Sequence, residues 1–353
     1  MTRLNTPTVK AESRPSSGLW SVMAGVALIA AVLAADLVDA RRSIASEQAP
    51  MVSGVYALRS FVLLAASIAV VLGLRQLAIR LPRRVDAATD VDPVAAAAGG
   101  SLIALGAGLL LLTDSSALSR LVREDQVVEW TSAVLAFAAA WFYGLAAKRC
   151  GFGPRGLLLA AVGSVCLLLG LEEISWFQRV LDVDSPDFML NRNGQQEINL
   201  HNLATGLTGN LYYVGAYGWG VLLPGLLGDR RLDGRWRWLN LLVPSRSVLF
   251  GSVTAAGVVY EMWNIAWIQI TFWMSLVMLG VVAQTFERRT TAIVLAVVTT
   301  ITAVVFLIGG SAMVRSWDDT EIRELIIPYG LTLAGLEAAR RSDRPEPDRA
   351  DRR

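Results

Sequence analysis

Residues 247–286, SVLFGSVTAAGVVYEMWNIAWIQITFWMSLVMLGVVAQTF, decide the fold, because they form one long apolar stretch in which Glu261 is the only charged residue. It is too long for one membrane crossing, which takes about 20 apolar residues, and just long enough for two joined by a tight turn near residues 261–264. The chain as a whole is also apolar: 54% of its 353 residues are hydrophobic and 18% are charged. A soluble domain has roughly a quarter charged residues. These features predict an all-α, polytopic membrane bundle.

Apolar runs near the length of a membrane crossing recur along the chain and predict about ten transmembrane helices. They cover residues 18–36, 55–74, 94–113, 129–147, 155–173, 207–227, 246–261, 266–285, 290–309 and 322–339. Glu324, Pro328 and Gly330 interrupt the tenth run. The polar tails 1–17 and 340–353 are expected to be disordered. Residues 18–339 are therefore expected to form one transmembrane domain.

The basic residues are unevenly distributed between the two sides of the predicted bundle. With the N-terminus inside, the inner segments hold 23 of the 32 Lys and Arg residues. This asymmetry predicts an N-in/C-in topology. Anionic lipid headgroups and topology together explain the arginines of the inner loops. The net charge of +2 does not indicate a nucleic-acid partner, so membrane lipids are the expected partners.

The positions and number of the cysteines argue against a disulfide bond and against a structural zinc site. Cys150 falls at the inner end of the fourth predicted helix and Cys166 in the middle of the fifth, so they are not expected to form a disulfide. Together with His201, the single histidine of the chain, they also cannot supply the usual four ligands of a structural zinc site.

The longest connection, residues 174–206, lies on the outer side directly after Glu172 and Glu173. Loops of this length are uncommon in a compact bundle and are often functional. The apolar run before them places both glutamates at or just inside the membrane boundary, where a carboxylate loses part of its hydration, so both are candidate general acids or bases. If the helix continues past them, further candidate binding residues follow on it: Trp176, Gln178 and Arg179. An ordinary solvated helix end with a Glu–Arg contact is the alternative interpretation.

Glu197 and His201 form the second part of the candidate site. Their spacing of four places them on one face if the segment is helical, as a base and its orienting partner or as two metal ligands. Asn199 and Asn202 flank them with amide groups that could bind a substrate. Glu197 and His201, together with Glu173, could hold a divalent cation such as Mn²⁺, Mg²⁺ or Fe.

Other acidic groups are expected to meet on the same outer side. Glu124, Asp125 and Glu129 precede the fourth predicted helix, where the helix dipole alone would also favour them. Glu261 lies at the turn between the seventh and eighth predicted helices. A last acidic group precedes the tenth: Asp318, Asp319, Glu321 and Glu324.

Three blocks, EEISWFQR (172–179), QEINLHN (196–202) and EDQVVEW (124–130), together resemble a signature of a family of prokaryotic multi-pass membrane proteins with no known activity. The resemblance covers roughly residues 120–205. It implies a prokaryotic cell-membrane protein with a common site at these residues. Two characterised families fit less well. Intramembrane glutamate proteases carry Glu-Glu-x-x-x-Arg and two later histidines, whereas Arg179 is two residues too far along and His201 is alone. Ceramidase-like hydrolases need three histidines for zinc.

Three functions are compatible with these residues. The first is an enzyme whose outward-facing acidic and histidine site acts on a lipid or a lipid-linked glycan, with Arg179 as a phosphate anchor. The second is a transporter or flippase, in which the acidic cluster binds a proton, a cation or a solute. The third is a non-catalytic membrane scaffold whose outer loop is a docking surface.

Overall fold

The computed structural model describes residues 17–38, 48–84, 90–123, 126–178, 180–185, 205–284, 288–315 and 317–343. Over these residues the chain is helical, and its one β-type pairing is an isolated bridge between Arg83 and Arg230. Several of the described helices are long and apolar enough to cross a membrane. The predicted class, a helical membrane protein, is confirmed at this level.

Six of the predicted spans are single helices long and apolar enough to cross a membrane. They are α1 (Ser17–Val38), α2 (Gly54–Ala78), α3 (Pro93–Thr113), α5 (Val127–Cys150), α6 (Pro154–Glu173) and α12 (Arg289–Gly309). Side-chain caps mark two of the starts. The Ser53 side chain accepts from the Tyr56 N–H at the start of α2, and Asp92 caps α3, in which Pro93 takes the first position.

The sixth, eighth and tenth predicted spans are helical but less regular. Residues 205–227 form one run, in which a π-helical segment, η3 (Gly218–Leu222), joins α8 (Thr205–Tyr217) to α9 (Leu223–Leu227). The eighth span is α11 (Ala266–Val282), and the tenth is α13 (Asp318–Ser342), which contains Pro328. Shorter helices lie in the connections: α4 (Ser115–Leu121), η1 (Ser175–Phe177), η4 (Gly234–Leu241), η6 (Glu261–Asn264) and η8 (Gly310–Ala312).

The prediction of one helix over residues 246–261 is wrong. Helix α10 (Arg246–Ser252) continues only as a 3₁₀ segment, η5 (Val253–Gly257), and Val258 is then extended, with φ −84° and ψ 90°. Gly257 approaches α12 so closely that a Cβ there would lie 2.4 Å from the Thr299 carbonyl oxygen. We call residues 246–257 the broken helix. Because its ends lie inside the bundle, their peptide groups need partners from other elements.

Helix α13 supplies a partner at the start of the broken helix. The carboxylate of Glu337 is fully buried and accepts hydrogen bonds from the Ser245 N–H (2.9 Å) and the Ser245 hydroxyl (2.5 Å). Arg341, one turn further along α13, donates to the same carboxylate at 2.7 Å. A negative charge at a helix N-terminus is also favoured by the helix dipole.

Helix α13 supplies the opposite charge at the far end. The Arg323 guanidinium donates to the Val258 carbonyl oxygen through Nε (3.0 Å) and Nη2 (2.6 Å), and the Tyr260 N–H donates to Asp319 at 2.8 Å. Arg323 and Asp319 are also 3.6 Å apart and both buried. The two acid–base pairs of α13 therefore bind the two ends of the broken helix, each with the sign that its dipole favours.

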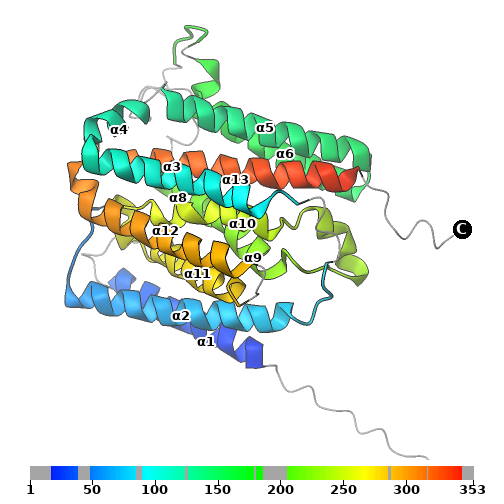
Figure 1. Cartoon of the computed structure of the whole chain (residues 1–353), viewed down its shortest axis with the longest axis horizontal. Helices are drawn as coiled ribbons and strands as arrows, with labels where there is room; N and C mark the ends of the chain where they lie inside the picture. Colours follow the sequence, from blue (N-terminus) through cyan, green and yellow to red (C-terminus); the bar gives the residue numbers. More distant parts are fainter. Residues whose placement is uncertain are drawn as a thin grey trace, which may run out of the picture.

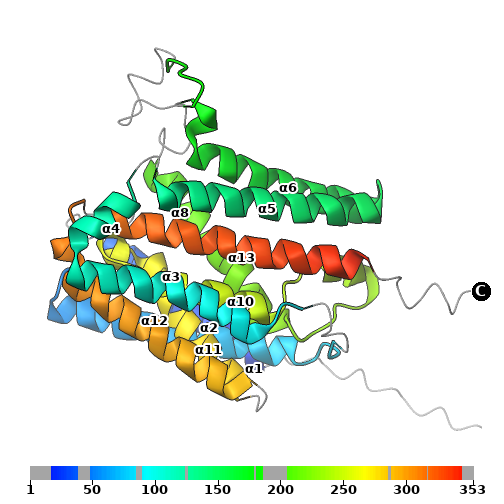
Figure 2. The same cartoon turned by 45° about the horizontal axis from the view of Figure 1, so that its top comes forward.

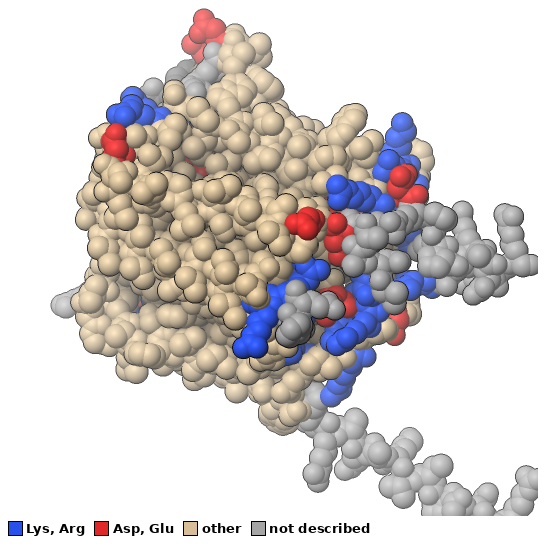
Figure 3. Space-filling model, in the orientation of Figure 1, with Lys and Arg blue, Asp and Glu red and all other residues tan. Residues whose placement is uncertain are grey.

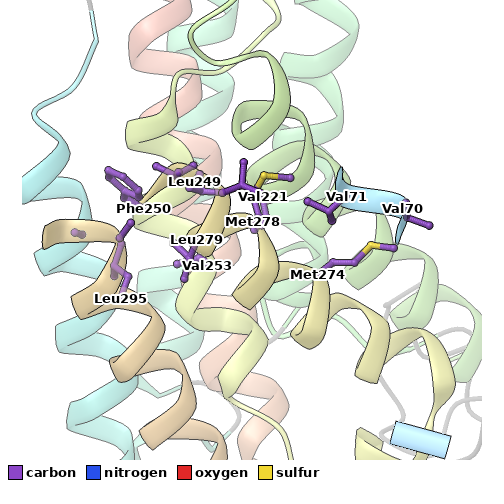
Figure 4. Close-up of a cluster of buried hydrophobic side chains, with 14 residues drawn as sticks. Val70, Val71, Val221, Leu249, Phe250, Val253, Met274, Met278, Leu279 and Leu295 are labelled. Atoms are coloured by element: carbon purple, nitrogen blue, oxygen red, sulfur yellow. The ribbon is translucent and has the colours of Figure 1, made fainter. Parts of the chain in front are cut away.

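The broken helix lies at the centre of the bundle. Helices α1 and α2 form one side of the molecule, and α5 and α6 pack together on the opposite side, next to α13 (Figures 1 and 2). The main buried core surrounds the broken helix, whose Leu249, Phe250 and Val253 pack with Met278 of α11 and Leu295 of α12 (Figure 4). Burial of these apolar side chains stabilises an element that is too short to be a stable helix alone.

The two ends of the bundle differ in charge. Lys and Arg residues gather at the end where α13 finishes, and much of the face between the ends carries no charge (Figure 3). We call this the basic end; α1 also begins there (Figure 1). We call the opposite end, where α6 finishes and α5 and α13 begin, the acidic end.

Candidate functional site

Three helices bring four glutamates together at the acidic end. Glu129 lies in the first turn of α5, Glu173 is the last residue of α6, and Glu321 and Glu324 lie in the first two turns of α13. Glu173 interacts electrostatically with Glu324 most strongly, then with Glu321 and Glu129. We call these four side chains the carboxylate cluster; each is half-buried.

Hydroxyl groups surround the carboxylate cluster. The Tyr213 hydroxyl donates to the Glu324 carboxylate, and the Ser132 hydroxyl, which donates to the Glu324 carbonyl oxygen at 2.9 Å, also hydrogen-bonds with Glu173. The buried Tyr212 hydroxyl interacts electrostatically with Glu173 and Glu324 but makes no hydrogen bond within the described part of the chain. A buried hydroxyl of this kind is a ready contact for a ligand or a water molecule.

The positive charges near the cluster are already engaged. Arg315 interacts with Glu321 but pairs with Asp318 at 2.9 Å, and Arg323 is bound to the broken helix. Like charges that lie close together disfavour each other's ionised form. Four carboxyl groups that lie this close together therefore repel one another when all of them are ionised.

A cavity lies next to the cluster, where the π-helical segment η3, η5, α11 and α13 meet. Its volume is about 50 Å³, and Tyr213 and Arg323 line it on the side of the cluster. Tyr217 and Ser252 also line it, and their buried hydroxyls have no hydrogen-bond partner among the described residues. A cavity of this size has room for a few water molecules, which those hydroxyls could bind.

The Arg323 guanidinium lines the cavity together with Tyr213. It lies 4.6 Å from the centroid of the Tyr213 ring, whose hydroxyl bonds Glu324. Tyr213 thus contacts the carboxylate cluster with its hydroxyl and a cation with its ring face. One continuous polar region runs from Glu324 through Tyr213 to the opened backbone at Val258.

The helix that carries Glu172 and Glu173 ends where the predicted fifth span ends, so Trp176 and Gln178 do not follow on it. Helix α6 ends at Glu173, and Ser175, Trp176 and Phe177 have φ values of 45°, 56° and 61°. This left-handed turn is unusual for residues other than glycine. It nevertheless brings the Trp176 indole N–H to 2.7 Å from the Glu172 carboxylate, so Glu172 binds a tryptophan.

The remaining described candidates lie apart from the carboxylate cluster. The Gln178 amide donates to Ser185 at 2.6 Å, within its own connection. Glu261 belongs to η6, where its carbonyl oxygen accepts from the Gln48 N–H and its carboxylate interacts with Asp319. The other candidates lie outside the described residues: Glu124, Asp125, Arg179, Glu197, Asn199, His201 and Asn202.

The predicted divalent cation has no ready site in the described part of the chain. No group of three or more His, Cys, Asp or Glu side chains is arranged there to hold a metal ion. The predicted ligand set included Glu197 and His201, which are not described, so the expectation rests on those residues together with Glu173.

Sequence reasoning selected Glu129 and Glu173 as site residues. It expected Glu321 and Glu324 on the same outer side but did not select them for the site. The signal was present: the two α13 glutamates are three residues apart, which places them on one helix face. Tyr212 and Tyr213 carried no such signal, because an aromatic pair in an apolar run is typical of a packed membrane helix. Their role becomes visible only from their contacts.

No protein-family model, curated protein or solved structure matches the chain.

Proposed function

We propose that the chain is a membrane enzyme that uses the carboxylate cluster for general acid–base catalysis on a lipid or a lipid-linked glycan. The observation that carries the proposal is the position of Glu173, at the end of a membrane-length helix and among three further carboxylates. A cluster that holds both ionised and protonated carboxyl groups contains a base and an acid at once. Such pairs are the usual agents of hydrolysis and transfer at hydroxyl groups.

Each group has a role in the proposed chemistry. An ionised Glu173 accepts a proton from water or from a substrate hydroxyl, and a protonated neighbour donates a proton to the leaving group. The Tyr212 hydroxyl, which has no partner among the described residues, is placed to bind the substrate beside Glu173. Glu197 with His201 would assist as base or cation ligands, and Arg179 would bind a phosphate.

The proposed substrate is amphipathic because of where the cluster lies. The helices that carry Glu129 and Glu173, α5 and α6, form one side of the bundle (Figure 2). Large apolar side chains on these two helices are exposed, among them Val134, Trp141, Leu157 and Val165. In a bilayer these surfaces contact lipid. A substrate could therefore keep its acyl or prenyl chain in the membrane and place its polar head at Glu173.

The proposal includes a topology. The basic end lies in the cytoplasm, since Lys and Arg mark the inner ends of membrane helices. Ten passes then cross a prokaryotic cell membrane, with the run 205–227, the broken helix, α11 and α13 adding to the six long apolar helices. The carboxylate cluster faces outward.

A lipid and glycolipid profile of a strain that lacks the gene tests the enzyme proposal. The strain is complemented with the wild type, with Glu173→Gln, or with Asp184→Asn, which changes an exposed carboxylate at the same end. We expect a lipid-linked species to accumulate in the strain and in the Glu173→Gln complement, and to disappear with the wild type and with Asp184→Asn. An unchanged profile in every strain would refute the proposal.

A transporter or flippase is the second candidate, and the broken helix favours it. Discontinuous helices in the interior of the bundle are where many transporters bind their substrates, and Ser252, Ala255 and Ala256 of the broken helix line the cavity described above. The accumulating species separates the two functions. In vesicles that contain the purified protein, an enzyme converts it to a chemically different product, whereas a flippase moves it unchanged to the other leaflet.

A further inference from the structure

An apolar groove runs along the outside of the bundle near the basic end. It lies between the last turns of α2 and the run η3–α9 and has a volume of about 440 Å³. Its walls are almost wholly leucine, from the two sides: Leu74, Leu77 and Leu81, and Leu222, Leu223 and Leu226. This volume lies within the range of small-molecule binding sites, and such a wall suits a hydrocarbon chain.

The groove ends at backbone that is held in place by hydrogen bonds. Arg230 donates through Nη1 to the carbonyl oxygens of Leu81 (3.1 Å) and Ile79 (3.3 Å). The Arg231 N–H donates to the Pro82 carbonyl oxygen at 2.8 Å. These bonds join the end of α2 to the segment after α9. The groove therefore has a rigid end, and Arg230 lies at it.

Three other arginines lie near Arg246, and one of them is Arg230 at the end of the groove. Arg246 interacts electrostatically with Arg75, Arg230 and Arg288. Among the described residues, the carboxylate that offsets them is Asp229, 3.0 Å from Arg246 and 3.5 Å from Arg230. The Nε of Arg246 is buried and has no hydrogen-bond partner in the described part of the chain. Positive charge therefore exceeds negative charge here, and a donor is left over.

We propose that this groove binds an anionic phospholipid, with an acyl chain between α2 and α9 and the phosphate among Arg75, Arg230, Arg246 and Arg288. Guanidinium groups bind phosphate oxygens with paired hydrogen bonds. Basic pockets between membrane helices are typical sites for anionic headgroups. The leucine wall would contact the acyl chain and the arginines would bind the anionic headgroup, so the ligand is expected to have both parts. This site is at the opposite end from the carboxylate cluster and does not depend on the proposed function.

Native mass spectrometry of the full-length protein in detergent tests the site. The protein is titrated with phosphatidylglycerol and with phosphatidylcholine of the same acyl chains. We expect phosphatidylglycerol to bind more tightly, by roughly 30-fold if two arginines each contribute about fivefold. Equal binding of the two lipids would refute the proposal.

Variants separate the headgroup contact from the groove. We expect Arg75→Gln/Arg288→Gln to remove most of the preference for phosphatidylglycerol. The matched control, Lys148→Gln/Arg340→Gln, removes two exposed charges at the same end from α5 and α13 and should leave the preference unchanged. Equal effects of the two double variants would mean that charge attracts lipid non-specifically, and would overturn the site.

Filling the groove tests the acyl-chain contact. We expect Leu77→Trp to weaken binding of phosphatidylglycerol at least tenfold, while the protein keeps its unfolding temperature. Soluble glycerol phosphate, which has no acyl chain, should not displace the lipid at millimolar concentration. Full displacement by glycerol phosphate, or unchanged lipid binding by Leu77→Trp, would refute a lipid site and indicate a phosphate site instead.

Discussion

Replacing Glu337 by Gln tests whether α13 holds the start of the broken helix. The carboxylate is fully buried and accepts from the Ser245 N–H (2.9 Å), the Val91 N–H (3.2 Å) and Arg341 (2.7 Å). A Gln side chain keeps the shape of Glu but replaces one carboxylate oxygen, an acceptor, with an NH₂ group. This group is a donor, and it would face other donors. Breaking a buried ion pair costs about 3–5 kcal/mol. Because Arg341 keeps Asp90 at 3.0 Å, we expect the lower end, about 3 kcal/mol.

Thermal unfolding of the purified protein with a thiol-reactive dye measures this loss, since the buried Cys166 becomes reactive when the bundle opens. At roughly 2 °C for each kcal/mol, the unfolding temperature of Glu337→Gln should fall by about 6 °C. The control is Asp343→Asn. Asp343 follows the last residue of α13, and its contact with Arg149 is exposed and 3.6 Å long. It should change stability by less than about 1 kcal/mol. Equal shifts in the two variants would refute the reasoning.

The same assay checks two further packing predictions. Gly100→Ala should destabilise the protein by about 1–3 kcal/mol, because its Cβ would lie 2.3 Å from the Gly251 carbonyl oxygen of α10. Gly106→Ala on the same helix meets open space and should be neutral or slightly stabilising; an equal loss in both would contradict the close approach. Arg59→Leu should cost about 3–5 kcal/mol, because it removes one member of a buried ion pair, the arginine that contacts Asp36 at 2.7 Å. Asp36→Leu/Arg59→Leu should recover most of it, and a double variant as unstable as the single one would show that the pair is not an isolated unit.

The predicted spans with the clearest apolar runs became single helices, and the least uniform parts did not. Residues 94–113 and 290–309 correspond to α3 and α12 nearly residue for residue. A run of apolar residues that is long enough to cross a bilayer forms a helix because its peptide groups must bond one another. The run 246–261, which has a charged residue at each end, did not form a single helix: its helical part ends at Gly257, where the backbone passes close to Thr299 of α12.

The candidate site was predictable in part. Glu173 stood out because it closes an apolar run at the membrane boundary, and Glu129 because it belongs to an acidic group that precedes a predicted helix on the same side. The turn at Trp176 was not predictable, since its left-handed backbone is unfavourable for each of its residues taken alone. The contact between Tyr213 and Glu324 joins residues 111 positions apart, and no local pattern signals it.

The sequence by itself determined that this chain is a bundle of membrane helices. The length and the apolarity of a run are local properties, and they decide whether a segment can cross a bilayer as a helix. Tertiary structure decided where the seventh run breaks and which carboxylates meet. The partners of the broken helix, Glu337 and Arg323, lie 92 and 65 residues along the chain from the groups they bind. Only packing of α13 against the broken helix brings those charges to the peptide groups that need them.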